Sequence, residues 1–355
     1  MLLSRFAKSV AALTMTGVIS AASVGCAAGD RDTNPTVVLK FADAYSATHP
    51  IGKAGAQPFL EYLQEHGPDV GLEIEYYGSG QMGKSKDMPT LLRTDVVQIA
   101  VITPSNVSSQ LPLSSVSELP GLVDNACHGA DALIKLMQEN GSIYENELEP
   151  IGIRPLWVAF VTDYEIMTAN REVREPEDIQ GQLVRSNGGM ADRIVDHLGA
   201  SGVSLPGPDL YEALSRGTVE GALFPPVSVL SYKLDETLAF STVGANLGLS
   251  NSTYAISTQA WARLSSEQRA VVTKASTLAN ENACRELPAA ADAAFEAMEA
   301  NGVQLLPIEG TTKSAWDSAL IPIREEWVRD LESIGKPARL VLTDFEQQLE
   351  RAADE

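Results

Sequence analysis

The chain has 355 residues, with 47 Asp and Glu against 26 Lys and Arg, which gives a formal net charge of −21. Hydrophobic residues make up 44% and charged residues 21%, proportions typical of a soluble globular protein, and the length favours two lobes over one small core. The acidity argues against nucleic-acid binding, which requires a basic face, and three Cys with four His are too few for a disulfide scaffold or a multi-metal protein.

The first 25 residues have the pattern of an export signal. Arg5 and Lys8 precede an apolar stretch at residues 10–22, which is too short and too rich in small side chains to predict a transmembrane helix. Small residues then lead into Cys26, as in a bacterial lipoprotein box, so we expect a lipid anchor at Cys26, with an ordinary signal peptide as the alternative. Residues 26–36 would tether this anchor to the folded body. The pattern predicts a protein exported to the periplasm or the cell surface.

Strand-like and helix-like segments alternate along the mature chain. The expected strands lie at residues 37–42, 72–77, 97–102, 151–161, 165–168, 183–185, 203–205 and 219–224. The expected helices lie at 55–66, 87–93, 129–139, 188–198 and 209–216, and a long helical stretch runs from 265 to 301, with a break expected near Pro288. This alternation predicts an α/β fold of mostly parallel sheets covered by helices on both faces. Since no Pro/Gly-rich linker separates two lobes, the chain is expected to cross between them more than once.

Cys127 and Cys284 remain once Cys26 is set aside. Two cysteines can pair in an exported protein. Their spacing in the sequence gives no distance between them, so a disulfide and two separate buried thiols both stay open.

Motifs that would indicate catalysis lack the context that they need. Gly78–Gly83 (GSGQMG) matches a dinucleotide-binding pattern, but the next strand ends at Thr103-Pro104 without the required acidic residue, so we expect a tight turn and no cofactor. The histidines lack metal-ligand spacing, and no G-x-S-x-G nucleophile motif is present. The sequence therefore predicts neither a metal site nor an enzyme.

Arg185 is the strongest candidate binding residue that the pattern alone provides. It ends the short strand at 183–185, and ligands of open α/β sheets bind beyond the carboxyl ends of strands. A guanidinium group matches a carboxylate through two parallel hydrogen bonds. The alternative is a surface ion pair with one of the many acidic residues.

Several segments, taken in order, resemble the solute-binding subunit of TRAP transporters, the DctP family. They are ATHPIG at 47–52, EIEYYGSGQMGKSKDMPTLLRTDVVQIAVITPS at 73–105, SELPGLV at 117–123, PEDIQGQLVRSNGG at 176–189, LGASGVSLPGPDLYEALSRGTVEGALFP at 198–225 and LSSEQRAVVTKAS at 264–276. The resemblance spans about residues 37–345. It implies a two-lobed α/β fold of the periplasmic-binding-protein type, with a ligand cleft between the lobes and a long C-terminal helix.

The same resemblance implies a function and its partners. The protein would capture a small organic acid and deliver it to TRAP membrane subunits, without a cofactor or a metal; the alternative is a sensor that presents its ligand to a signalling receptor. Lobe I is expected at 37–161 and 249–290, and lobe II together with the C-terminal helices at 162–248 and 291–355. The long C-terminal helix would pack across both lobes or mediate a homodimer, as in some relatives.

The resemblance also assigns binding roles to individual residues. The family's carboxylate-clamping Arg matches Arg185. Phe224 stands where many relatives carry a polar Asn, and Tyr164-Glu165 stands where many place a second Arg or Gln. These departures favour a monocarboxylate with an apolar or aromatic body, with Glu165 facing a hydroxyl or amine of the ligand. Core packing of Phe224 and internal pairing of Glu165 are the alternatives. Further lining candidates are Tyr45, Ser105, Asn106 and Asn187.

Overall fold

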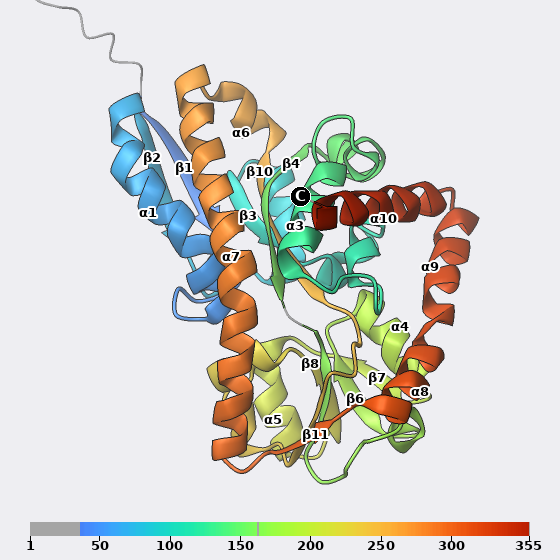
Figure 1. Ribbon diagram of the computed structural model, residues 1–355. Coiled ribbons are helices and arrows are strands. Elements are labelled where there is room, and N and C mark those ends of the chain that lie inside the picture. The colour runs from blue at the N-terminus through green and yellow to red at the C-terminus, as the bar shows by residue number, and fades with distance from the viewer. Residues whose placement is uncertain (1–35, 162, 355) are drawn as a thin grey trace, which may run out of the picture. The chain divides into compact units, whose positions relative to one another are not determined.

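A computed structural model describes residues 36–161 and 163–354 of the chain (Figure 1). The export signal, Cys26 and most of the expected tether lie outside the described residues. Residues 35–355 form one compact unit by their contacts. Within the described part of the chain, no helix combines the length and the apolar character that crossing a membrane requires.

The first sheet has five strands in the order β2-β1-β3-β10-β4. Their bounds are β1 Val37–Ala42, β2 Leu72–Tyr77, β3 Ile99–Ile102, β4 Ile153–Val161 and β10 Ser250–Ser257. β1 pairs in parallel with β2 and β3, whereas β10 pairs antiparallel with β3 and β4. All four residues of β3 are buried, as expected for an apolar strand covered on both faces. The associated helices are α1 Gln57–His66, α2 Met88–Arg93, α3 Ala126–Met137 and α6 Thr258–Arg263.

The second sheet has six strands in the order β11-β9-β5-β8-β6-β7. Their bounds are β5 Glu165–Thr168, β6 Leu183–Ser186, β7 Ser201–Ser204, β8 Gly221–Phe224, β9 Phe240–Val243 and β11 Gln304–Pro307, with helices α4 Gly189–His197 and α5 Leu210–Ser215. β6 lies between β7 and β8 and runs parallel to both. β5 is antiparallel to β8 and β9.

Both sheets are therefore mixed, where the sequence predicted mostly parallel pairing. The antiparallel members, β5 and β10, are the strands that the chain enters directly from the other sheet: β4 leads into β5, and β9 leads into β10. No helix intervenes to reverse the direction of the chain at these two points. We call the residues around the first sheet lobe I and those around the second sheet lobe II.

One long helix, α7 (Ser266–Ala300), runs beside both lobes (Figure 1). It packs on α1, α3 and β4 in lobe I and on the short turn Pro226–Ser228 and β11 in lobe II. The break expected at Pro288 is absent: the proline lies inside the helix, where it removes one backbone hydrogen bond. Leu287 and Ala291 on either side of it are buried, so packing holds the helix together through this point.

Three helices follow: α8 Gly310–Leu320, α9 Pro322–Ser333 and α10 Ala338–Asp354. The sequence grouped these C-terminal helices with lobe II. The last of them, α10, packs on α3 of lobe I (Figure 1). Its buried residues Val341, Leu342 and Phe345 have the spacing of an amphipathic helix. This spacing explains why one face of α10 is buried, but it does not predict that α3 is the element that covers it.

Cys127 and Cys284 form a disulfide, which decides between the two alternatives that the sequence left open. Their Cα atoms lie 4.8 Å apart. Cys127 lies in the first turn of α3, which Asn125 caps by accepting hydrogen bonds from two backbone N–H groups. The bond therefore fastens the long helix α7 to lobe I across a sequence separation of 157 residues.

Replacing both cysteines with serine (Cys127→Ser with Cys284→Ser) should lower the free energy of unfolding by about 2–5 kcal/mol, because the disulfide closes a long loop and restricts the unfolded chain. Urea denaturation followed by circular dichroism measures the change. A reductant should lower the stability of the wild type and leave that of the double variant unchanged. An equally stable double variant would contradict the expectation.

Candidate ligand-binding site

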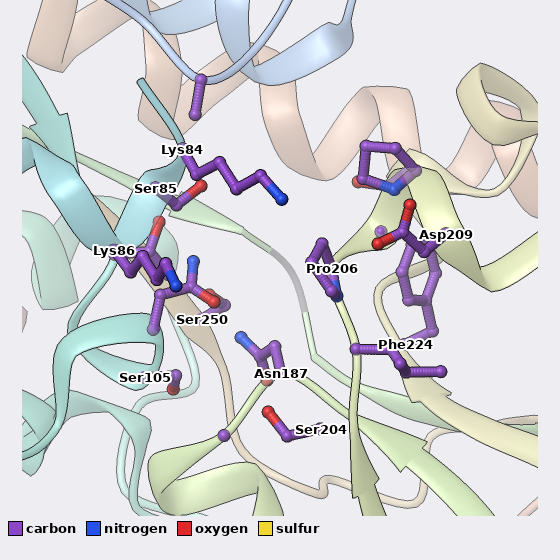
Figure 2. A pocket seen from close by; sticks show the side chains of 18 of the residues that line it. Lys84, Ser85, Lys86, Ser105, Asn187, Ser204, Pro206, Asp209, Phe224 and Ser250 are labelled. Atoms are coloured by element: carbon purple, nitrogen blue, oxygen red, sulfur yellow. The ribbon is translucent and has the colours of Figure 1, made fainter. Parts of the chain in front are cut away.

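A pocket of about 760 Å³ lies between the two lobes (Figure 2). Much of its wall comes from residues at or just beyond the carboxyl ends of strands: Ala44 and Tyr45 after β1, Thr103, Ser105 and Asn106 after β3, Arg185 and Asn187 at β6, Leu205 and Pro206 after β7, and Phe224 and Pro225 at β8. Both sheets thus direct these ends into one space, which is where open α/β sheets bind ligands.

Arg185 is buried in the wall of this pocket, with 3% of its surface exposed. Its Nε donates a hydrogen bond to the carbonyl of Leu205 (2.8 Å), and Nη1 donates to the carbonyl of Leu223 (3.3 Å). Its Cζ lies 4.9 Å from the centroid of the Phe224 ring. Within residues 36–161 and 163–354, these contacts supply no carboxylate partner. The guanidinium is therefore a buried cation without an ion pair, which is unfavourable unless an anion joins it.

The electrostatic surroundings of Arg185 are mostly phenolic. Burial lowers the pKa of Arg185 to about 10, and this effect is opposed first by Tyr164, then by Tyr232, Tyr45 and Asp192. All three tyrosines line the pocket. Tyr164 lies in the crossover from β4 to β5, so lobe I, the crossover and lobe II each contribute one phenol. An anion on Arg185 would therefore lie among hydroxyl groups that can donate hydrogen bonds.

Tyr45 is held in place from lobe I. Its backbone N–H donates to Oδ1 of the fully buried Asp43 (2.8 Å), and its hydroxyl lies 3.2 Å from Oγ of Ser252. The ring of His49 lies 4.9 Å from the Tyr45 ring and 5.5 Å from the Tyr232 ring, measured between centroids. These ring contacts connect lobe I to lobe II beside the pocket.

The backbone of the two lobes also meets at Ser105. Gly188 and Gly189, directly after β6, have φ of +95° and +56°. A Cβ on Gly188 would lie 2.9 Å from the carbonyl oxygen of Ser105, and one on Gly189 would lie 3.0 Å from its Cα. Glycine is therefore required here both for its left-handed backbone and for the close approach. The neighbouring Asn187 points into the pocket (Figure 2).

Ser105 is hydrogen-bonded to the buried acid Glu118. Its hydroxyl donates a 2.5 Å hydrogen bond to Oε2 of Glu118, which is 1% exposed. The other carboxyl oxygen, Oε1, has no hydrogen-bond partner among the described residues. Burial raises the pKa of Glu118 from 4.5 to about 8, and the hydrogen bonds from Ser105 lower it only in part.

The structure brings together all but one of the side chains that the sequence selected as lining candidates. Tyr45, Ser105, Asn106, Tyr164, Arg185, Asn187 and Phe224 all line the pocket. Glu165 does not line the pocket, so the expected contact between Glu165 and the ligand is wrong. Its carboxylate accepts from the N–H of Gly244 (2.8 Å) and from the hydroxyl of Thr242 (2.5 Å), and burial raises its pKa to about 7.

The position of Glu165 has a simple cause. Successive side chains of an extended segment point to opposite faces, so when Tyr164 faces the pocket its neighbour faces away. The carboxylate instead ties the segment that enters β5 to the segment that leaves β9. The alternative interpretation, that Glu165 pairs internally, agrees with these hydrogen bonds.

Sequence reasoning missed several lining residues. Tyr232 is the last residue of a short 3₁₀ helix, Leu230–Tyr232, and does not follow a strand. Lys84 and Lys86 lie beyond the Gly78–Gly83 turn. This turn is tight, as predicted, and it is fastened to the end of β1 because Ser79 N–H donates to the Tyr45 carbonyl (2.8 Å). This hydrogen bond places the segment after the turn beside the pocket. No local sequence pattern predicted that position.

Comparison with known proteins decides the family. Residues 41–330 match the DctP model, described as bacterial extracellular solute-binding protein, family 7. The chain belongs to this family. The resemblance read from the ordered segments is thus confirmed, and so is the two-lobed α/β fold. As a member of the DctP family, the protein is a solute-binding protein and not an enzyme.

Relatives and solved structures agree with this assignment. The chain is 26% identical over 297 residues to the C4-dicarboxylate-binding periplasmic protein DctP of Rhodobacter capsulatus, covering 82% of this chain and 86% of that protein. A TRAP solute-binding protein from Rhodoferax ferrireducens, in complex with copurified benzoate, superimposes with a TM-score of 0.80 at 20% identity, covering 90% and 99% of the two chains. One from Bordetella bronchiseptica, with bound (R)- and (S)-mandelate, gives 0.78 at 22% identity, covering 89% and 99%.

Gly188→Ala should destabilise the protein more than Gly181→Ala. Gly181 also has a positive φ, of +75°, but a Cβ there would have no atom within 4 Å. Gly181→Ala should therefore cost about 1–2 kcal/mol from the left-handed backbone alone, whereas Gly188→Ala adds the clash with Ser105, worth about another 1–3 kcal/mol. Urea denaturation of both variants measures the difference. Equal losses would show that the lobes do not touch at Ser105.

Glu118→Gln should flatten the pH dependence of stability. The raised pKa of Glu118 means that the folded chain holds this proton more tightly than the unfolded chain. The acid's contribution to stability is therefore full below about pH 4.5 and is lost as the pH rises to about 8. Over this window the variant should gain a few kcal/mol relative to the wild type.

Urea denaturation at several pH values checks this expectation, with Glu73→Gln, a change of an exposed acid, as the matched control. The control should follow the wild type throughout. A Glu118→Gln curve parallel to that of the wild type would contradict the expectation.

Proposed function

We propose that this protein is the extracytoplasmic binding component of a TRAP-type transporter, which captures a small organic acid and delivers it to membrane subunits. The observation that carries the proposal is the buried Arg185, which lines a cleft and has no acidic partner within the described residues. The pocket volume of about 760 Å³ is in the range typical of small-molecule sites. Export and a lipid anchor at Cys26 belong to the same proposal and would keep the protein near its membrane partners.

Arg185 is arranged to clamp a carboxylate. Of its five N–H donors, Nε–H and one Nη1–H are engaged by the carbonyls of Leu205 and Leu223. The remaining donors of Nη1 and Nη2 form one edge of the fork, which matches two carboxylate oxygens. Each charge-assisted bond contributes about 1.5–3 kcal/mol, so two bonds supply a large part of the roughly 8 kcal/mol that a micromolar complex needs.

The body of the ligand would lie against an apolar part of the pocket. Phe224, whose ring packs on the Arg185 guanidinium, lines it together with Val161, Leu205 and Pro206. These side chains favour a monocarboxylate with an aromatic or apolar body over a C4-dicarboxylate. The structural neighbours with bound benzoate and mandelate, and a marine metagenome protein with 3-hydroxybenzoate at a TM-score of 0.81 and 19% identity, support this choice of ligand class.

Arg185→Met should abolish ligand binding while leaving the fold intact, because the substitution removes a buried, unpaired charge and keeps an apolar stem. Isothermal titration calorimetry with benzoate, (R)-mandelate, 3-hydroxybenzoate and succinate provides the measurement. The wild type should bind at least one aromatic acid more tightly than succinate, and Arg185→Met should lose at least about 100-fold in affinity, the equivalent of two charge-assisted bonds.

Arg216→Met is the matched control, because Arg216 is exposed on lobe II and already pairs with Glu212. Its affinity should equal that of the wild type. Retained binding in Arg185→Met would remove the residue from its role as the clamp, and tighter binding of succinate than of every aromatic acid would overturn the proposed ligand class.

A further inference from the structure

Lys84 and Lys86 bring two positive charges to the pocket that the Arg185 clamp does not use. Both lie on the segment of lobe I after the Gly78–Gly83 turn, both side chains are exposed, and both line the pocket. In Figure 2 the side chain of Lys84 extends into the space between the lobes, towards Pro206 and Asp209 of lobe II. Neither ammonium group lies within ion-pair distance of a carboxylate in the part of the chain that the structure describes.

The turn fixes these lysines at the pocket. Gly80 N–H donates to the carbonyl of Asp43 at the end of β1 (2.9 Å), and Lys84 N–H donates to the carboxylate of Asp87 (3.0 Å). The backbone bond of Gly80 therefore fastens the turn to the residue after β1, and the side chain of Asp87 holds the backbone at Lys84. The fold therefore places the backbone of both lysines beside the pocket.

An anionic ligand has an electrostatic difficulty in reaching this site. The chain carries a formal net charge of −21, which repels anions at long range. Three cations, Arg185, Lys84 and Lys86, line the pocket against two carboxylates, Asp192 and Asp209. The formal charge of the lining is thus positive with the lysines and negative without them. Because Arg185 is buried, the lysines are the part of this charge that an approaching ligand meets first.

We propose that Lys84 and Lys86 form a cationic entrance that draws carboxylates into the pocket and so raises the association rate constant, leaving the grip on the bound ligand to Arg185. This role rests on the proposed function, since it concerns the same anionic ligand. Clefts lined by one sign of charge focus the field and accelerate the capture of oppositely charged ligands, and salt weakens the effect. The lysines would therefore act on the association rate rather than on the lifetime of the complex.

Stopped-flow binding of 3-hydroxybenzoate tests the proposal with two double variants of equal net charge. Lys84→Gln with Lys86→Gln should lower the association rate constant about fourfold at about 10 mM salt, taking about twofold for each unit charge at about 10 Å in water, and should leave the dissociation rate constant unchanged. The difference should disappear at about 1 M salt, where the Debye length is about 3 Å. Lys40→Gln with Lys274→Gln, exposed lysines away from the pocket, should behave as the wild type.

Two results would overturn the proposal. An association rate constant equal to that of the control double variant would show that the lysines do not guide the ligand. A faster dissociation with unchanged association would show that they contact the bound ligand instead.

A second measurement does not depend on ligand binding, so it still tests the cationic entrance if the proposed ligand class is wrong. A cysteine placed at the exposed pocket residue Ser204 (Ser204→Cys, with Cys26→Ser) is alkylated by anionic iodoacetate and by neutral iodoacetamide. The thiol's pKa and accessibility affect both alkylation rates in the same way, so they cancel in the ratio of the two rates. The ratio therefore reports the local electrostatic potential. Adding Lys84→Gln and Lys86→Gln should lower the ratio about fourfold at low salt, and the control pair should leave it unchanged. An unaltered ratio in the first case would refute a cationic entrance.

Discussion

The binding site depends on keeping one guanidinium buried in a cleft without an acidic partner of its own. β6 makes this possible because it lies between β7 and β8 in the sheet, and carbonyls from both flanking chains accept hydrogen bonds from Arg185. Backbone carbonyls satisfy part of the donor set without neutralising the charge. The positive charge is thereby kept for a ligand, and the phenols of Tyr164, Tyr232 and Tyr45 are its electrostatic neighbours.

The crossovers from β4 to β5 and from β9 to β10, together with the long helix α7, join the two lobes. Glu165, the first residue of β5, accepts hydrogen bonds from Thr242 of β9 and from Gly244, which follows β9. α7 packs along both lobes and is bonded to α3 through Cys284. Around the pocket, the lobes meet at the backbone of Ser105 and in the ring contacts of His49. Hinged closure around a ligand is the usual motion of two-lobed binding proteins, and here the elements that must flex are few and identifiable.

Much of the site could be predicted from the sequence because its determinants are local. Arg185 ends a short strand within a recognisable segment, Tyr45 lies near the end of the first strand, and Phe224 was selected through the family resemblance. The break expected at Pro288 failed because tertiary packing outweighs one lost hydrogen bond. Lys84 and Tyr232 could not be placed, since their position depends on how the lobes meet. The alternation between Tyr164 and Glu165 was available in the sequence and would have turned the acid away from the ligand.

The packing of Phe224 on Arg185 has a consequence for the shape of the anion. The ring covers one face of the guanidinium, and the carbonyls of Leu205 and Leu223 occupy part of its rim. A flat carboxylate can align both oxygens with the free edge and remain in that plane. A tetrahedral oxyanion such as sulfate or phosphate would direct one of its other oxygens to the side of the plane that the aromatic ring covers. A ligand would thus reach the guanidinium along its free edge and not over the face that the ring covers.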